Sequence, residues 1–307
     1  MTYDVMIIGS GPAGLTAGIY TTRASLKTLI IAGVKWGGQL QLTTLVENYP
    51  GFPDGIQGPD LMTAMRKQAE KFGAEIIDAD FSNADFNPPA GGPFKVLTSE
   101  NSYESKSVII ATGADTKWLE AKGEKEKIGR GISSCAPCDA PFFKDKNVIV
   151  VGGGDSAMEE ALVLTKFAKE VTLVHRRDAF RASQIMQEKV KNNPKIKILF
   201  NTEITEILGQ DKVTGVKLKN NKTNETTEMP IDGVFVAIGH LPNTNMLSGI
   251  DTDEGGFIKV YDHTKTNVEG VFVAGDVHDN HYKQAVTAAG FGCQAALEVE
   301  KWLRDKH

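Results

Sequence analysis

The sequence is short of the features that mark several large classes of protein. It has only three cysteines in 307 residues, an odd and small number that excludes the disulfide framework of a secreted domain. It has no excess of basic residues, since Lys and Arg total 34 against 39 Asp and Glu. General nucleic-acid binding is therefore not expected. No apolar run reaches the length of a transmembrane helix. What remains is a chain long enough for two domains with real apolar cores.

The N-terminal residues also lack the pattern of a secretory signal peptide. A strand-like stretch, residues 3–8, begins at once, without a basic region or a cleavage site. We therefore expect a cytoplasmic protein. In a reducing compartment, a Cys-x-x-Cys pair is more often catalytic than structural.

Two of the three cysteines form such a pair. Cys135 and Cys138 are separated by two residues, and Asp139 follows directly. A zinc site would need further ligands, and no second Cys-x-x-Cys or His-x-x-x-His supplies them. We expect no metal site and assign Cys293, which lies far away in a small-residue helical stretch, to the core. A redox role for the pair is the favoured interpretation.

The chain begins with a dinucleotide-binding pattern. An apolar strand at residues 4–9 leads into a G-x-G-x-x-G turn, and a helix-forming stretch, residues 15–23, follows. The first glycine permits the tight turn, the second lets the backbone approach a pyrophosphate, and the third allows close helix packing. The turn consists of Gly9, Ser10, Gly11, Pro12, Ala13 and Gly14.

An expected carboxylate is missing from this first unit. In many NAD-binding folds an acidic residue ends the second strand and binds the ribose hydroxyls. Here the strand at residues 28–32 is followed by Gly33 and Val34. This absence weakens a simple NAD interpretation of the first site.

The same pattern occurs a second time. A strand at residues 146–151 feeds a G-x-G-x-x-A turn at Gly152, Gly154 and Ala157, and residues 234–239 echo residues 108–113. Two turns and two matching strand ends in the same order indicate an internal duplication. The predicted fold class is α/β, with two Rossmann-like three-layer nucleotide-binding domains.

A basic cluster marks the second turn as a site for NADPH. After the strand at residues 171–174, where an NAD enzyme would carry an acid, the chain has His175, Arg176 and Arg177, with Arg181 close behind. Guanidinium groups suit a 2′-phosphate by charge and by bidentate geometry. We therefore predict NADPH rather than NADH.

Other segments complete the expected organisation. Residues 60–72 and 284–303 read as helices, and a hairpin is expected around residues 220–224. The polar stretch at residues 115–131 and the turn at residues 239–244 read as connections between domains. A strand at residues 271–277 contains Gly275 and Asp276, which places a carboxylate at an edge where a cofactor could lie.

Taken together, these motifs closely resemble those of the low-molecular-weight thioredoxin reductases. The similarity runs from end to end and includes residues 9–14, 37–40, 47–51, 111–114, 135–139, 152–160, 175–182, 239–244 and 274–277. The resemblance implies a homodimeric flavoprotein that passes electrons from NADPH through FAD and a Cys135–Cys138 disulfide to thioredoxin or a thioredoxin-like protein. It implies an FAD-binding domain formed by residues 1–115 and 246–307. An NADPH-binding domain, residues 116–245, would be inserted into it and would carry the cysteine pair.

The resemblance also assigns residues to each cofactor. FAD would contact residues 9–14 together with Gly38, Gln39, Leu40, Asn48, Ala111, Thr112, Gly113, Gly275, Asp276, Lys283, Gln284 and Ala285. NADPH would contact Gly152, Gly154, Asp155, Ser156, Ala157, His175, Arg176, Arg177, Arg181, Ile238 and Gly239.

Three positions depart from the family pattern. The family usually has Arg at the position of Lys283 and Gly at that of Ala140, and Pro137 is a less usual residue inside the pair. Of the two sulfurs, that of Cys138 is expected to face the flavin. Asp139 is expected to transfer a proton to and from the departing thiolate. The resemblance further implies that the inserted domain rotates, with hinges expected at residues 129–131 and 239–244.

Four other functions are open to such a chain. They are a flavoprotein fed by ferredoxin or another donor, the reductase component of a peroxide-scavenging system, a ferredoxin–NADP reductase, and a non-catalytic nucleotide sensor. The basic cluster argues against the first. The second usually carries an extra N-terminal thiol domain. The third should lack a Cys-x-x-Cys pair, and the fourth would leave the cysteines idle.

Overall fold

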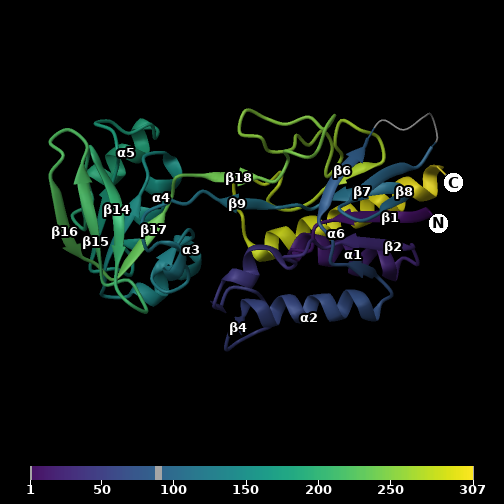
Figure 1. Ribbon diagram of the computed structural model, residues 1–307, viewed down its shortest axis with the longest axis horizontal. Coiled ribbons are helices and arrows are strands. Elements are labelled where there is room, and N and C mark those ends of the chain that lie inside the picture. The colour runs from purple at the N-terminus through teal and green to yellow at the C-terminus, as the bar shows by residue number, and fades with distance from the viewer. Residues whose placement is uncertain (1, 87–91, 307) are drawn as a thin grey trace. The chain divides into compact units, whose positions relative to one another are not determined.

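The chain folds into two compact units (Figure 1). The computed structural model describes residues 2–86 and 92–306. Unit 1 combines Met1–Asp115 with Leu241–His307, and unit 2 is Thr116–His240. The chain therefore passes between the units at residues 115/116 and 240/241. The glycines at positions 129 and 131, predicted as a hinge, lie inside unit 2 and do not connect the units.

Unit 1 is built on a parallel sheet. Its strand order is β5-β2-β1-β8-β19, and β7 and β6 extend it from β8 in antiparallel fashion. Met6 of β1 pairs with Leu29 on one side and with Val108 on the other. The strands are β1 (Thr2–Ile8), β2 (Thr28–Ile31), β5 (Glu75–Ile77), β6 (Phe81–Asp85), β7 (Phe94–Thr98), β8 (Ser102–Ile110) and β19 (Val271–Val273).

The side chains of β1 point alternately to the two faces of this sheet, and each face packs against different elements. Val5 and Ile7 point into a core shared with α1 (Pro12–Arg23), α2 (Gly58–Lys71) and α6 (Ala285–Lys306). Met6 and Ile8 point into a second core formed with β6, β7 and the loop around Ile250. Unit 1 thus has three layers, and the helices found in residues 2–86 and 92–306 of this unit cover one face of its sheet.

Unit 2 repeats this topology. Its parallel sheet has the order β13-β12-β11-β17-β10, which matches the order β5-β2-β1-β8-β19 of unit 1 position by position. The strands are β10 (Ile132–Ser133), β11 (Asn147–Val151), β12 (Glu170–Val174), β13 (Ile196–Leu199) and β17 (Gly233–Val236). The predicted duplication and the α/β fold class are confirmed.

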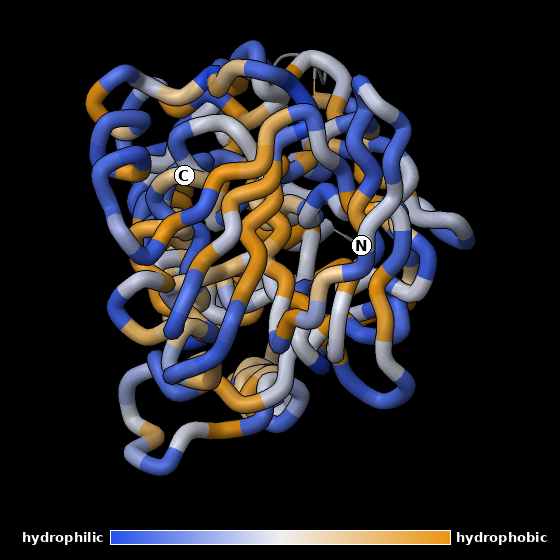
Figure 2. Tube along the Cα trace, turned by 90° about the vertical axis from the view of Figure 1, so that its left-hand side faces the viewer, coloured by the Kyte–Doolittle hydropathy of each residue, from blue (hydrophilic) through white to orange (hydrophobic). Residues whose placement is uncertain are grey.

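The two faces of the unit 2 sheet are again covered differently. On one face lie α3 (Ala136–Asp139), η3 (Ala140–Phe143), α4 (Asp155–Leu164) and α5 (Gln184–Lys191). On the other lies an antiparallel sheet of β14 (Thr202–Leu208), β15 (Gly215–Asn220) and β16 (Thr226–Pro230). The turn between β15 and β16 confirms the expected hairpin. Figure 2 shows the apolar runs along the strands and the polar residues in the connecting loops.

Short elements complete the chain. They are η1 (Gly38–Leu42), β3 (Leu45–Val46), β4 (Ile56–Gln57), β9 (Ala114–Thr116), η2 (Lys125–Lys127) and β18 (His240–Pro242). β9 and β18, which contain the two crossing points, pair with each other. Within the described residues, no helix combines the length and the apolar character needed to span a membrane.

Candidate functional site

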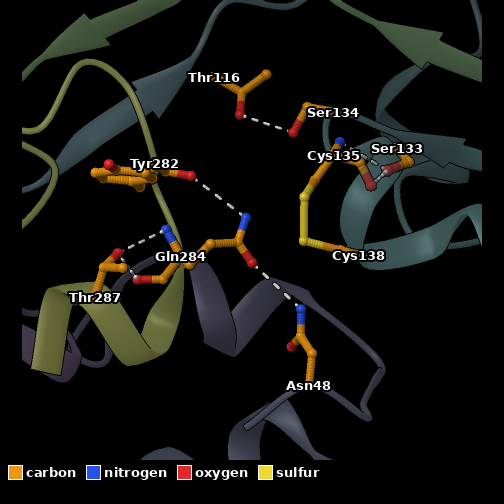
Figure 3. Close-up of a disulfide and its surroundings, with 9 residues drawn as sticks. All are labelled: Asn48, Thr116, Ser133, Ser134, Cys135, Cys138, Tyr282, Gln284 and Thr287. Carbon is orange, nitrogen blue, oxygen red and sulfur yellow. Dashed lines mark hydrogen bonds between the residues drawn. A yellow bond between two sulfur atoms is a disulfide. The ribbon is translucent and has the colours of Figure 1, made fainter. Parts of the chain in front are cut away.

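Cys135 and Cys138 form a disulfide at the start of α3 (Figure 3). Cys135 is the N-cap of the helix, and its carbonyl accepts the N–H groups of Cys138 at 3.2 Å and Asp139 at 3.1 Å. Pro137 suits the first helical turn, because its fixed φ matches the helix and its missing N–H would lack an intrahelical partner there. Both cysteines are half-buried. The short spacing therefore produces a tight turn with an accessible disulfide.

The residues after the disulfide hold it against the core. Ala140 is fully buried and packs in the cluster that contains Ala157 and Met158 of α4. Asp139 is half-buried, and burial raises the pKa of its carboxyl, while a hydrogen bond from Ser133 acts in the opposite direction. A carboxyl whose pKa is raised beside a disulfide can hold a proton and release it.

The first glycine-rich turn is closed at its ends and open in the middle. A methyl group on Gly9 would meet the carbonyl of Ala111, and one on Gly14 would meet the carbonyl of Gly9. A methyl group on Gly11 would meet no atom of the described residues within 4 Å. The turn therefore leaves space beside the backbone where a pyrophosphate would lie, in front of the N-terminus of α1.

Ser10 has a structural role in this turn. Its buried hydroxyl donates to the carbonyl of Ala32 at 2.8 Å and accepts the N–H of Gly37 at 2.9 Å. It thereby ties the turn to the end of β2 and to the loop before η1. Gly38, in the left-handed region with φ 64°, faces the Cα of Gly11 across this junction.

Asp276 is the buried acid of unit 1. Burial and the charge of Asp279 raise its pKa to about 6. Its Oδ1 atom is buried and meets no hydrogen-bond partner among residues 2–86 and 92–306. An unpaired buried oxygen is costly, and a ribose or ribityl hydroxyl would satisfy it. Together with the open space at Gly11, this orphaned acceptor fits the FAD that the sequence predicts.

The loop after Asp276 is shaped by a residue that the sequence analysis did not single out. Asp279 is buried and accepts the N–H groups of His281, Tyr282 and Lys283 at 3.0, 2.9 and 3.1 Å. Lys283 takes a left-handed conformation, φ 49°, and its amine donates to the carbonyl of Asn280 at 3.0 Å. Sequence pattern alone cannot separate this anchoring carboxylate from a surface one.

Two predicted residues far apart in the sequence meet in unit 1. Asn48 Nδ2 donates to Gln284 Oε1 at 3.2 Å, 236 positions later in the chain (Figure 3). Residues 47–53 line a cleft of ≈ 420 Å³. Gln39, the second residue of η1, donates from Nε2 to Oδ1 of Asp115 at 2.9 Å.

The remaining predicted residues of unit 1 lie in three places. Thr112 Oγ1 donates to the carbonyl of Asn243 at 2.8 Å, and Gly113 accepts the N–H of Asn243 at 3.0 Å. Gly275 packs against the start of α1, where a methyl group would lie 2.8 Å from the Cβ of Ala13. Leu40 packs on the core shared with the helices, and Ala285 is the first residue of α6.

The second glycine-rich turn repeats the geometry of the first. A methyl group on Gly152 would meet the carbonyl of Ala237, the counterpart of Ala111, whereas one on Gly154 would meet no described atom within 4 Å. Ala157 is buried behind the turn. Asp155 accepts the N–H and the hydroxyl of Ser183 at 3.0 and 2.8 Å. This link joins the N-termini of α4 and α5.

The structure separates His175 from the other basic residues. Arg176, Arg177 and Arg181 are exposed after β12. His175 is buried, its Nε2 lies 3.1 Å from the carbonyl of Ala179, and its ring fills the space beside Gly153. Burial lowers the pKa of His175, as do the three neighbouring arginines. A neutral, packed imidazole shapes the loop, while the guanidinium groups are available to an anion.

The last predicted residues lie where β17 ends. Ser156 is exposed in the first turn of α4, Ile238 packs on the core of unit 2, and Gly239 is exposed with φ 110°. In residues 2–86 and 92–306, no group of three or more His, Cys, Asp or Glu side chains is placed to hold a metal ion.

Known proteins with similar sequence and structure share this arrangement over the whole chain. The pyridine nucleotide-disulphide oxidoreductase family model matches residues 3–292. The thioredoxin reductase of Rickettsia felis is 53% identical, with 99% of each chain covered. That of Mycolicibacterium smegmatis is 50% identical, with 99% of this chain and 97% of the relative covered. The crystal structure of a thioredoxin reductase from Streptococcus pyogenes superposes with a TM-score of 0.93 at 43% identity, covering 99% of both chains.

Proposed function

The chain belongs to the pyridine nucleotide-disulphide oxidoreductase family, and from that membership we propose that it reduces the disulfide of thioredoxin or a thioredoxin-like protein with electrons from NADPH. The observation that carries this function is the Cys135–Cys138 disulfide, half-buried beside an acid in a chain with two dinucleotide turns. The relatives that are 53% and 50% identical to this chain over its full length are thioredoxin reductases.

FAD is assigned to unit 1. Gly11 leaves space for the pyrophosphate, Asp276 offers an unpaired acceptor, and Asn48 and Gln284 lie together. A flavin held by these residues would supply the two-electron chemistry that connects NADPH to the disulfide. The residues of unit 1 bind and orient it, and Asp279 fixes the loop that carries Gln284.

NADPH is assigned to unit 2. Gly154 leaves the backbone open at the N-terminus of α4, where the pyrophosphate would be stabilised by free N–H groups. Arg176, Arg177 and Arg181 are exposed after β12, and their guanidinium groups would bind the 2′-phosphate there. The buried ring of His175 packs beneath the loop that carries these arginines and would not itself contact the phosphate.

The cysteine pair carries out the exchange with the protein substrate. Two electrons break the S–S bond, and each sulfur is left as a thiolate that takes a proton when it does not act as nucleophile. One thiolate attacks the disulfide of the partner, and the other resolves the mixed disulfide, which restores Cys135–Cys138 and releases a dithiol. We assign electron entry to Cys138 and proton transfer to Asp139, which directly follows it.

We also propose that the protein is a cytoplasmic homodimer. The reduction of a thioredoxin-like partner suits a reducing compartment. Light scattering after size-exclusion chromatography measures the mass directly. A mass equal to one chain at micromolar concentration would contradict the dimer without affecting the proposed activity.

A variant of one cysteine tests the proposed order of electron transfer. In Cys138→Ser, NADPH should still bleach the flavin absorbance under anaerobic conditions, while NADPH-dependent reduction of thioredoxin should be lost. Cys293→Ser is the control, because Cys293 lies in α6 of the other unit, and it should retain both. If NADPH fails to bleach the wild-type flavin, the donor is not NADPH. If Cys138→Ser alone fails to bleach, the order is wrong.

A further inference from the structure

The three residues after β2 have no side chain that can accept a hydrogen bond. In dinucleotide-binding folds an acid at this point usually accepts hydrogen bonds from the hydroxyls of the adenosine ribose. Here β2 ends at Ile31, and Ala32, Gly33 and Val34 follow it. A carboxylate for the ribose of a dinucleotide in unit 1 must therefore come from another segment of the chain.

The internal duplication indicates which residues of unit 1 correspond to the basic cluster of unit 2. The N–H of Ala32 donates to the carbonyl of Ile77 on β5 at 2.9 Å. In unit 2 the N–H of His175 donates to the carbonyl of Leu199 on β13, also at 2.9 Å. Since β5 and β13 are corresponding strands, Ala32 corresponds to His175. The two residues after Ala32 thus correspond to arginines that are assigned to the ribose 2′-phosphate of NADPH.

Asp80 brings a carboxylate to this position from the loop between β5 and β6. Its Oδ1 accepts the N–H of Val34 at 2.8 Å. The same oxygen would lie 3.5 Å from a methyl group on Gly33. The N–H of Gly33 donates to the carbonyl of Ala79 at 3.2 Å, so the backbones of the two loops are joined as well. The carboxylate of Asp80 therefore lies beside the residues that follow β2, although Asp80 is 46 positions away from Val34 in the sequence.

Asp80 differs from the nearby acids because no cation neutralises it. Arg66 of α2 binds Asp78 with both terminal nitrogens, at 2.7 and 3.1 Å, and binds Glu70 through Nε at 3.1 Å. Asp80 is exposed, and among the residues that the structure describes it forms no ion pair. Its Oδ1 bonds to Val34, and its Oδ2 has no hydrogen-bond partner in that part of the chain. This second oxygen is available to a ligand.

The first glycine-rich turn is tied to the same residues. The hydroxyl of Ser10 donates to the carbonyl of Ala32 at 2.8 Å. The open space beside Gly11 and the carboxylate of Asp80 therefore both adjoin the segment that follows β2. The pyrophosphate and the adenosine ribose are adjoining parts of one dinucleotide, so a ligand with its pyrophosphate at this turn brings its ribose to this segment.

We propose that Asp80 is the acceptor for the adenosine ribose of FAD and replaces, from the loop after β5, the acid that is missing after β2. This inference rests on the proposed function, in which unit 1 binds FAD. Oδ1 of Asp80 holds the segment after β2 through Val34, and Oδ2 accepts a hydrogen bond from a ribose hydroxyl. The residue contributes to the affinity for the adenosine half of the cofactor and does not act on the flavin half.

A competition between two flavins tests this contact without enzyme turnover. The full-length chain, freed of flavin, is incubated with an excess of FAD and of its 2′,3′-dideoxyadenosine analogue, which lacks both ribose hydroxyls. The ratio of the two flavins that stay bound after rapid gel filtration gives the preference. The wild-type chain should prefer FAD by at least about tenfold, the value of one hydrogen bond to a charged group.

Two variants separate the ribose contact from the bond to Val34. Asp80→Asn keeps an oxygen for the N–H of Val34 and loses the charge, so its preference for FAD should fall about fivefold or more. Asp80→Ala should show almost no preference. Glu104→Gln is the control for charge, because Glu104 is exposed and pairs with the first residue of β1, at the end of the sheet away from the turn. It should keep the wild-type preference.

The competition also has outcomes that contradict the role of Asp80. If Asp80 only braces the loop, its variants will weaken FAD and the analogue alike, and the ratio will stay at its wild-type value. That result, or a wild-type chain without preference, would overturn the inference while FAD binding and thioredoxin reduction remain. A chain that binds neither flavin would refute the proposed function and this inference with it.

Discussion

The negative charge of buried Asp276 lowers the free energy of unfolding of the protein. Its pKa is raised from the ordinary 3.8 to about 6 by burial and by Asp279. Below about pH 4 the carboxyl is protonated in both the folded and the unfolded chain. Between pH 4 and 6 the unfolded chain loses its proton first, so the free energy of unfolding falls as the pH rises. Above pH 6 the full cost, up to about 3 kcal/mol, is present.

We predict that Asp276→Asn stabilises the apoprotein and weakens FAD binding. An uncharged amide removes the cost of burying the charge, so the urea midpoint of unit 1 should rise at pH 8, whereas at pH 4 the two proteins should unfold alike. The variant should also lose FAD more readily on dilution, because a neutral amide oxygen is a weaker hydrogen-bond acceptor than a carboxylate oxygen. A gain in stability of equal size at pH 4 and pH 8 would show that the effect does not come from ionisation. Glu254→Gln, which removes an exposed acid in the same unit, controls for the loss of a negative charge.

The exposed arginines after β12 predict a preference for NADPH. Loss of a hydrogen bond to a charged group costs about 1.5–3 kcal/mol, so Arg177→Ala should raise the KM for NADPH by roughly 10- to 150-fold. The KM for NADH, which lacks the 2′-phosphate, should change little. Steady-state kinetics with both nucleotides measures the difference. Lys197→Ala, which removes an exposed cation paired with Glu170 in the same unit, should alter neither. An equal loss with NADPH and NADH would contradict a phosphate contact.

The local sequence pattern was enough to predict residues whose role depends on the backbone conformation of their own segment. It missed residues whose role depends on contacts with distant parts of the chain. The cysteines and the two turns are recognisable because their spacing dictates their geometry. His175 was grouped with the arginines, yet its ring is buried beside Gly153 and Phe180, which no spacing reveals. Asp279 acts through hydrogen bonds that form only once the loop after Asp276 is in place.

At the scale of elements, the two strand–turn–helix units make a prediction about their glycines. A methyl group on Gly11 or Gly154 meets no described atom, whereas one on Gly14 or Gly152 would meet backbone. Gly11→Ala should therefore keep the thermal stability of the apoprotein and reduce FAD binding at least about tenfold, because the methyl group occupies space beside the pyrophosphate. Gly154→Ala should do the same for NADPH.

Gly14→Ala and Gly152→Ala are the matched controls. They should lower the melting temperature of the apoprotein, since the helix must move away from the turn to relieve the clash. Differential scanning fluorimetry and cofactor titration separate the two effects. If Gly11→Ala destabilised the apoprotein as much as Gly14→Ala does, there would be no space for a methyl group beside Gly11, contrary to the structure.

Most helices and strands could be predicted because their patterns are local. The helices expected at residues 60–72 and 284–303 correspond to α2 and α6, and the hairpin corresponds to β15 and β16. β6 was missed, since its sequence at residues 81–85 is polar and it gains its place by pairing with β7. The hinge expected at residues 129–131 was wrong because glycine there serves tight local turns, at φ 74° and 111°, within unit 2.

At the scale of the whole molecule, the two units have separate apolar cores. Two clusters of buried residues belong to unit 1 and two others to unit 2. Each unit also carries one glycine-rich turn of its own. A ligand that binds one folded unit should stabilise that unit by mass action, so ligand-selective unfolding can assign each cofactor to a unit.

The three tryptophans make this assignment measurable. Trp36 and Trp302 pack on the helix-side core of unit 1, and Trp118 packs on a core of unit 2. The variant Trp118→Phe therefore reports on unit 1, and the double variant Trp36→Phe, Trp302→Phe reports on unit 2. At about 100 times its Kd a ligand adds about 2.7 kcal/mol to the free energy of unfolding. FAD added to the apoprotein should shift the urea transition of the unit 1 reporter, and adenosine 2′,5′-bisphosphate, which carries the 2′-phosphate, that of the unit 2 reporter. The opposite pattern would reverse the cofactor assignment, because mass action stabilises only the unit that binds the ligand.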